Sequence, residues 1–238
     1  MHDSSEANDP GPEEEPGFEI PESWPPPEEE EQAVQEIVAP LFPLARVWLH
    51  PGVVMPLHIF EPRYRSMIED SLDGPGRLVI GTVTPANERS MQGAPPCYPI
   101  AGLGEIGRHE RLPDGRFHIW LVGLSRVSLR EIESPHDYRL VRATTLVEED
   151  CPSQREDELR AALVEAVQAR TPGELNLPEQ TPIGRLADLL LMHLPLATQA
   201  RQELFGVLPA LQRAEAVLEH HAEPPFETPE DSFEDADD

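Results

Sequence analysis

The chain has 238 residues, and its 45 acidic and 18 basic residues give a formal net charge of −27. All of those basic residues are arginines. The absence of lysine excludes chemistry that needs a lysine amine, such as a P-loop nucleotide site, a Ser-Lys dyad or a lysine Schiff base. Phosphate backbones and anionic membrane surfaces repel an acidic chain, so we expect neither nucleic-acid binding nor membrane binding.

The negative charge is concentrated at the two ends of the chain. Residues 1–39 contain 13 acidic residues, seven prolines and no arginine, and residues 219–238 contain nine acidic residues and no arginine. Residues 40–218 hold the other 23 acidic residues and all 18 arginines, which is a net charge of −5. Such tails cannot bury enough apolar surface to offset chain entropy. We therefore predict disordered acidic tails at 1–36 and 222–238.

Cysteine usage and the N-terminal sequence bear on the cellular compartment. Cys97 and Cys151 form no CxxC pair; they are either two free thiols, which we favour, or one disulfide. The opening MHDSSEANDP lacks the basic and apolar regions of a secretory signal, and no apolar run is long enough to span a membrane. We expect a cytoplasmic protein.

The pattern of residues 37–150 predicts a β domain. The run 41–60, LFPLARVWLHPGVVMPLHIF, is rich in β-branched and aromatic residues and interrupted by prolines, which predicts strands joined by a turn at Pro51-Gly52. Residues 62–72 instead have helical spacing, with Pro62 at the first position and Glu61 at the positive end of the helix dipole. Further strands are predicted at 77–83, 98–109, 117–122, 126–130 and 138–148. About six short strands with Gly and Pro turns favour a closed or half-closed β-barrel.

Residues 151–221 are predicted to form a helical subdomain. Ser153 and Glu156 match a capping box that would start a helix ending at Arg170. Thr181 and Pro182 match the N-cap and first position of a second helix. Two more short helices are predicted within 194–208 and 209–221. The fold class is therefore α+β, a barrel followed by a helical bundle.

No motif predicts catalysis. Residues 102–107 match G-x-G-x-x-G, but a hairpin rather than a helix follows, so the glycines are better explained by a bulge or close packing. His109-Glu110 lacks the second histidine of a zinc-protease motif, and no other histidines have metal-ligand spacing. We therefore predict no catalytic residue, no metal site and no cofactor.

Residues 56–65, PLHIFEPRYR, combine apolar, aromatic and charged side chains where a strand meets a helix. One interpretation is structural: Glu61 caps the helix, Pro62 starts it, and Arg63 or Arg65 ties the junction to a nearby carboxylate. The other is a recognition surface on the barrel. The sequence leaves both open.

The run LFPLARVWLHPGVVMPLHIFEPRYRSMIED resembles the start of the substrate-binding N-terminal domain of the Lon protease family. The likeness continues through RLVIGTVTP, residues 98–106, and VGLSRVSLREI, in which Gly123, Leu124 and Arg126 match a G-L-x-R pattern that we take as structural. It ends with ADLLLMHLPLATQARQELFGVL and the helix after it, so it spans about 40–221. The resemblance implies a PUA-like β-barrel followed by helices. Gly102-Leu103-Gly104 departs from the commoner G-T form, which predicts a local bulge.

The resemblance implies a non-catalytic module that binds unfolded or degron-bearing polypeptides, because the family's ATPase and Ser-Lys protease modules have no counterpart here. Candidate polypeptide-binding residues are Leu57, His58, Phe60 and Tyr64. Two alternatives stay open: an adaptor or regulator of a full-length Lon protease, and a barrel that binds a small ligand. RNA binding by analogy with PUA folds conflicts with the net charge.

Overall fold

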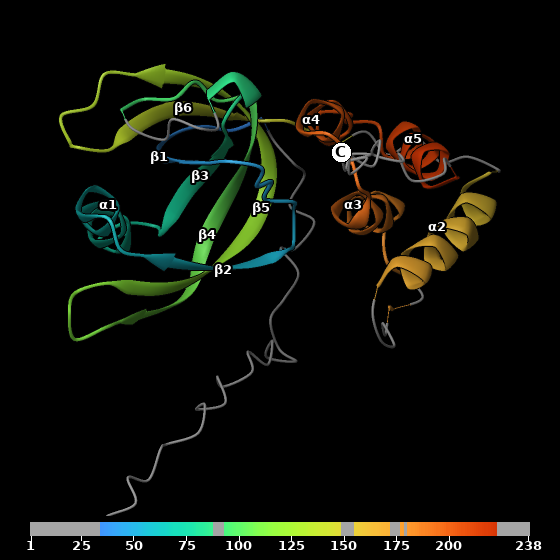
Figure 1. Ribbon diagram of the computed structural model, residues 1–238, viewed down its shortest axis with the longest axis horizontal. Helices are drawn as coiled ribbons and strands as arrows, with labels where there is room; N and C mark the ends of the chain where they lie inside the picture. The colour runs from blue at the N-terminus through green and yellow to red at the C-terminus, as the bar shows by residue number, and fades with distance from the viewer. Residues whose placement is uncertain (1–33, 88–92, 149–154, 172–176, 179, 223–238) are drawn as a thin grey trace, which may run out of the picture. The chain divides into compact units, whose positions relative to one another are not determined.

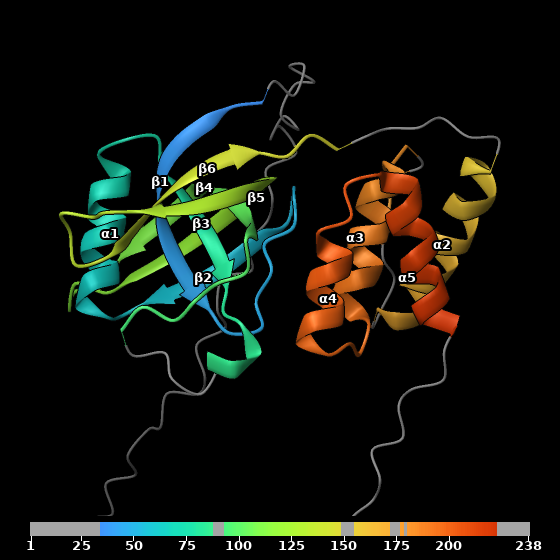
Figure 2. The same cartoon turned by 90° about the horizontal axis from the view of Figure 1, so that it is seen from above.

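The computed structural model describes residues 34–87, 93–148, 155–171, 177–178 and 180–222. Within them the chain forms a mixed β-sheet followed by helices, which confirms the predicted α+β class (Figures 1 and 2). The first part consists of β1 (Glu36–Leu44), β2 (Val54–Ile59), α1 (Pro62–Leu72), β3 (Arg77–Thr82), β4 (Ile100–Arg111), β5 (Phe117–Ile132) and β6 (Arg139–Thr145). The second part consists of α2 (Glu156–Arg170), α3 (Ile183–His193), α4 (Thr198–Phe205) and α5 (Ala210–Ala222).

The sheet closes on itself through its longest strand. Its order is β2-β5-β4-β3-β1-β6, and β6 also pairs with β5, so five strands form a ring and β2 is attached outside it. The 16-residue β5 pairs with β2 from Phe117 to Val122 and with β6 from Val127 to Ile132. All pairings are antiparallel except that of β1 with β3. The predicted barrel is therefore confirmed.

The prediction of two separate strands at 117–122 and 126–130 is wrong, because β5 runs through both. The register between β4 and β5 shifts at Leu103/Gly104 and again at Ile106/Arg108. The first shift lies at Gly102-Leu103-Gly104, but its extra residue is Leu124 of β5, because Leu103 pairs with Ser125 and Gly104 with Gly123. The bulge predicted at these glycines is therefore on the partner strand, and β4 has its own extra residue at Gly107. A bulge breaks the alternation of a strand without ending it, which is why the pattern suggested an interruption.

The segment 45–53 between β1 and β2 is a loop, although the sequence predicted a strand up to Pro51. This loop lies directly against two glycines of the sheet. A Cβ atom at Gly102 would lie 2.2 Å from the carbonyl oxygen of Leu49, and one at Gly123 would lie 2.0 Å from that of His50. Only glycine allows so close a backbone approach. The prediction that glycines of the G-x-G-x-x-G match permit close packing is therefore confirmed.

Separate apolar clusters stabilise the two parts. Tyr64, Met67 and Ile68 on α1 are buried against the sheet. The helices share a cluster that includes Leu163, Leu186, Leu190, Phe205 and Val217, all at most 1 % exposed. No helix among the described residues is long and apolar enough to cross a bilayer.

The helix starts differ from the predictions at two caps. Helix α3 begins at Ile183 with Pro182 as N-cap, because the Thr181 hydroxyl donates to the carbonyl of Pro178 at 2.7 Å. Arg155 is at the N-cap of α2, and Ser153 of the predicted capping box lies outside the described residues. Cys97 is a free thiol, and Cys151 also lies outside the described residues.

Candidate functional site

A buried group of charged residues connects the sheet to the helices, with Arg126 of β5 at its centre. The Arg126 side chain is 0 % exposed. Its Nε donates to the carbonyl oxygen of Phe205 at 2.7 Å, and its terminal nitrogens donate to the carboxylates of Glu148 and Asp188. The guanidinium also lies 4.8 Å from the centre of the Phe205 ring. One side chain thus connects β5, α3 and the end of α4.

Asp188 of α3 is the second shared member of this group, which we call the junction network (His50, Arg126, Glu148, Asp188 and Arg213). Its carboxylate lies 3.1 Å from Nε of Arg213 and 3.3 Å from Nδ1 of His50. Arg213 in turn donates to Glu148 at 2.8 Å. Two arginines and two carboxylates balance in charge when His50 is neutral, so the buried charges compensate one another.

The pKa shifts within the network follow from this arrangement. Burial lowers the pKa of His50 below its usual 6.5 and outweighs the opposing effect of Asp188, so the imidazole stays neutral near pH 7. Burial alone would raise the pKa of Asp188. The nearby His50, Arg126 and Arg213 outweigh burial and hold that pKa far below its usual value of 3.8.

These shifts predict that acid destabilises the domain in two steps. His50 binds its proton more readily in the unfolded chain, so we expect its contribution to stability to decline as the pH falls below its ordinary pKa of 6.5. The contribution of Asp188 declines only below its ordinary pKa of 3.8. Urea unfolding of the wild type and of His50→Gln between about pH 7.5 and pH 5 would measure the first step.

The His50→Gln variant should lack the decline that begins near pH 6.5, the usual pKa of this histidine. The matched control is His109→Gln, because His109 is exposed on β4. Parallel pH profiles for His50→Gln and the wild type would contradict the prediction.

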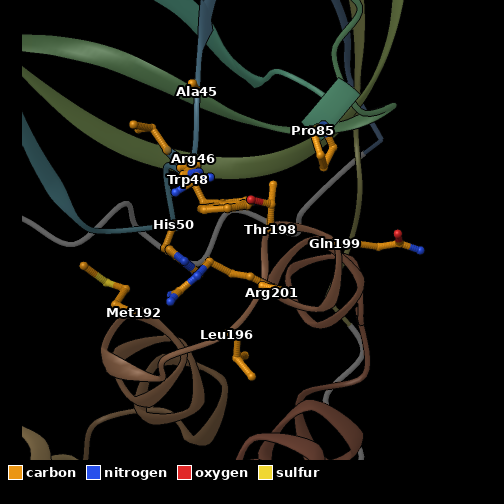
Figure 3. Close-up of a pocket in the computed structure, with 12 residues that line it drawn as sticks. Ala45, Arg46, Trp48, His50, Pro85, Met192, Leu196, Thr198, Gln199 and Arg201 are labelled. Carbon is orange, nitrogen blue, oxygen red and sulfur yellow. The ribbon is translucent and has the colours of Figure 1, made fainter. Parts of the chain in front are cut away.

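Next to the junction network is a pocket of about 1040 Å³, which we call the junction pocket (Figure 3). Its lining comes from the β1–β2 loop and from the end of α3 and start of α4. The described residues that line it are Ala45, Arg46, Val47, Trp48, His50, Pro85, Met192, Leu196, Ala197, Thr198, Gln199 and Arg201. Apolar side chains and arginines therefore share one concave surface of the size that binding sites have.

Two contacts hold the Trp48 side of the pocket in place. The indole N–H of Trp48 donates to the side-chain oxygen of Gln202 at 2.8 Å, and Gln202 donates to the carbonyl oxygen of Ile100 at 3.0 Å. Arg201 lies over the Trp48 ring at 5.5 Å from its centre. Met192 lies on the opposite side of the pocket and is 39 % exposed. The pocket thus combines a fixed aromatic side chain with an accessible flexible one.

The four residues predicted to bind polypeptide do not share one surface. Tyr64 is buried against Phe42, with ring centres 4.5 Å apart, and half-buried Leu57 packs on the same core. His58 is exposed, and so is Phe60, at 60 %. The His58 ring lies 4.9 Å from that of His118 on β5, on the outer face of the sheet. None of the four lines the junction pocket as described.

The residues predicted to have structural roles lie in two places. Glu61 is the N-cap residue of α1 and Pro62 its first residue, but the Glu61 side chain makes no capping bond and pairs with Arg63 at 3.0 Å. Arg65 lies against the hairpin turn at Gly115. Gly123 and Arg126 are at the junction of the sheet and the helices. Gly123 allows the close approach of the β1–β2 loop, and Arg126 lies at the centre of the junction network.

Sequence reasoning missed most of the junction. It gave no role to His50, Glu148, Asp188 or Arg213, and it did not identify the pocket. One signal was available: Asp188 is a lone acidic residue among the apolar positions of ADLLLMHL. A carboxylate on a buried helix face requires a positively charged partner.

A ring of five strands with one added strand, joined through buried charges to a helical bundle, defines the class of structure. The sequence profile of the ATP-dependent protease La (LON) substrate-binding domain matches residues 38–222. The chain belongs to this family.

Two solved structures have the same fold. A Lon N-terminal domain protein from Xanthomonas campestris superposes with a TM-score of 0.57 at 20 % identity, covering 77 % of this chain and 98 % of that one. The N-terminal domain of Lon protease from Mycobacterium avium complex gives a TM-score of 0.55 at 15 % identity, covering 79 % of this chain and 99 % of that one.

The curated relatives are named Lon protease. The protein from Heliobacterium modesticaldum is 27 % identical over 196 residues, which are 79 % of this chain and 24 % of the relative. The protein from Geobacter metallireducens is 25 % identical over 216 residues, 85 % of this chain and 26 % of the relative. The chain therefore spans about a quarter of the length of these relatives.

Proposed function

We propose that this chain binds unfolded or degron-bearing polypeptides and contributes no catalysis of its own. Membership of a family described as a substrate-binding domain supports the proposal. The observation that carries it is the junction pocket, which presents Trp48, Met192 and Leu196 on one concave surface. Accessible apolar side chains in a concave site are suited to segments that folded proteins keep buried.

A charge placed in the pocket tests this proposal. Met192→Glu should weaken binding of fluorescently labelled unfolded casein at least about tenfold, because a carboxylate would have to lose water against an apolar ligand. Fluorescence anisotropy is the measurement, with a folded protein as the negative ligand. The matched control is Val38→Glu, since Val38 is 53 % exposed on β1 and lies outside the described pocket lining.

A third variant distinguishes binding at the junction pocket from binding at the surface around Phe60 that the sequence predicted. Phe60→Glu changes the exposed residue of that surface. If Phe60→Glu lost casein binding and Met192→Glu kept it, the binding site would lie on the outer face of β2 instead. No binding of casein by the wild type at tens of micromolar would contradict the proposed function itself. If this chain captured a Lon protease but no unfolded polypeptide, the result would favour the adaptor alternative.

A further inference from the structure

The junction pocket has a charge opposite to that of the chain around it. The chain carries a net charge of −27, yet no acidic residue is among the described residues that line the pocket. Arg46 and Arg201 both line it. A concave surface with charge of one sign attracts ligands of the other sign.

The contacts of Arg201 with the described residues include no carboxylate. Ten other described arginines lie within ion-pair distance of a carboxylate. The Arg201 guanidinium donates to the carbonyl oxygens of Leu191 and Leu194, which fix its position beside Trp48. Burial lowers the pKa of Arg201. A carboxylate brought by a ligand would offset the cost of burying this charge.

The backbone at Arg46 gives a second reason to regard the arginines as part of a site. Arg46 has a φ of +58°, and among the described residues it is the only one other than glycine with a positive φ. An arginine pays a conformational cost in this region, where glycine or asparagine is more favourable. Favourable interactions of the Arg46 side chain at this position would offset the conformational cost.

We infer that the junction pocket binds acidic segments of unfolded polypeptides, with ligand carboxylates beside Arg46 and Arg201 and a neighbouring apolar side chain against Trp48. This inference rests on the proposed function and adds the class of segment that is recognised. Peptide rather than an isolated anion fits the lining, because apolar side chains as well as two arginines line a pocket of about 1040 Å³.

The net charge of the chain does not prevent this binding at physiological salt. The excess negative charge lies mostly in residues 1–39 and 219–238, and residues 40–218 carry a net charge of only −5. At this ionic strength, interactions beyond about 8 Å are largely screened. Local contacts with the arginines therefore dominate for a ligand inside the pocket.

Three short fluorescein-labelled peptides test the inference on the full chain. The first alternates Glu with Leu and Phe, and in the other two Gln or Lys replaces every Glu. We expect the acidic peptide to bind at least about tenfold more tightly than the glutamine peptide, because each charge-assisted hydrogen bond adds to its affinity. The lysine peptide should bind most weakly of the three.

Arg46→Asn is the informative variant, because asparagine keeps the left-handed backbone and removes the charge. It should weaken binding of the acidic peptide about tenfold, and by clearly more than it weakens binding of the glutamine peptide. The control is Arg130→Asn, which removes an exposed arginine of β5 and should change neither affinity. Circular dichroism would verify that both variants are folded.

Two results have different meanings. Equal binding of the three peptides, or equal effects of the two arginine variants, would overturn the inference if unfolded casein still binds. If the wild type binds neither casein nor any peptide, the proposed function fails as well.

Discussion

Asp188→Asn is expected to lower the free energy of unfolding by about 3–5 kcal/mol, because it removes the more deeply buried of the two carboxylates that Arg126 and Arg213 share. The Asp188 side chain is 3 % exposed, and those of Arg126 and Arg213 are 0 % exposed. Asparagine has nearly the same shape, so the effect reports the lost charge rather than a cavity. Urea unfolding monitored by circular dichroism would measure it.

The control for this substitution is Glu215→Gln on α5. Glu215 pairs with Arg155 at 3.0 Å, but both side chains are largely exposed. An exposed ion pair contributes at most about 1 kcal/mol. Similar losses for the two variants, or a loss below about 1 kcal/mol for Asp188→Asn, would show that the junction network does not hold the two parts together.

Gly123→Ala is expected to cost about 2–3 kcal/mol, because its methyl group would overlap the β1–β2 loop. The added Cβ would lie 2.0 Å from the carbonyl oxygen of His50, and a backbone atom cannot rotate away as a side chain can. The loop would have to move, and it carries both His50 and Trp48. We expect a lower urea midpoint and weaker casein binding in the same variant.

Gly74→Ala provides the matched control for the same change of residue. There an added Cβ would lie 3.7 Å from the carbonyl oxygen of Ser71, an ordinary van der Waals distance. Its effect should stay within about 0.5 kcal/mol. If Gly123→Ala were as mild as this control, the loop would not depend on the close approach to the sheet.

Much of the fold could be predicted because local patterns determine it. The apolar run of β3, the alternation in the first half of β5 and the helical spacing in α1 are all features of neighbouring residues. The loop at 45–53 was misread as strand because Val47 and Trp48 have high β propensity. Contact with glycines far along the chain overrides that propensity, and a local pattern does not contain it.

The site was harder to predict than the fold. Asp188 and Arg126 are 62 residues apart in the sequence, so no spacing rule relates them. Tyr64 was chosen for a binding surface because it lies in a dense motif, although its helical spacing with Met67 and Ile68 also fitted a core position. The structure shows that the core reading applies. Aromatic character by itself does not separate the two roles.

The directional bonds around Arg126 also have a mechanical consequence. Apolar contacts tolerate small displacements of one surface over another. A guanidinium that is hydrogen-bonded to Phe205, Glu148 and Asp188 keeps its bonds in only one relative position of these groups. Shear between β5 and the helices would therefore break several bonds of one side chain at once. We expect these bonds to resist such shear more than apolar contacts of the same size would.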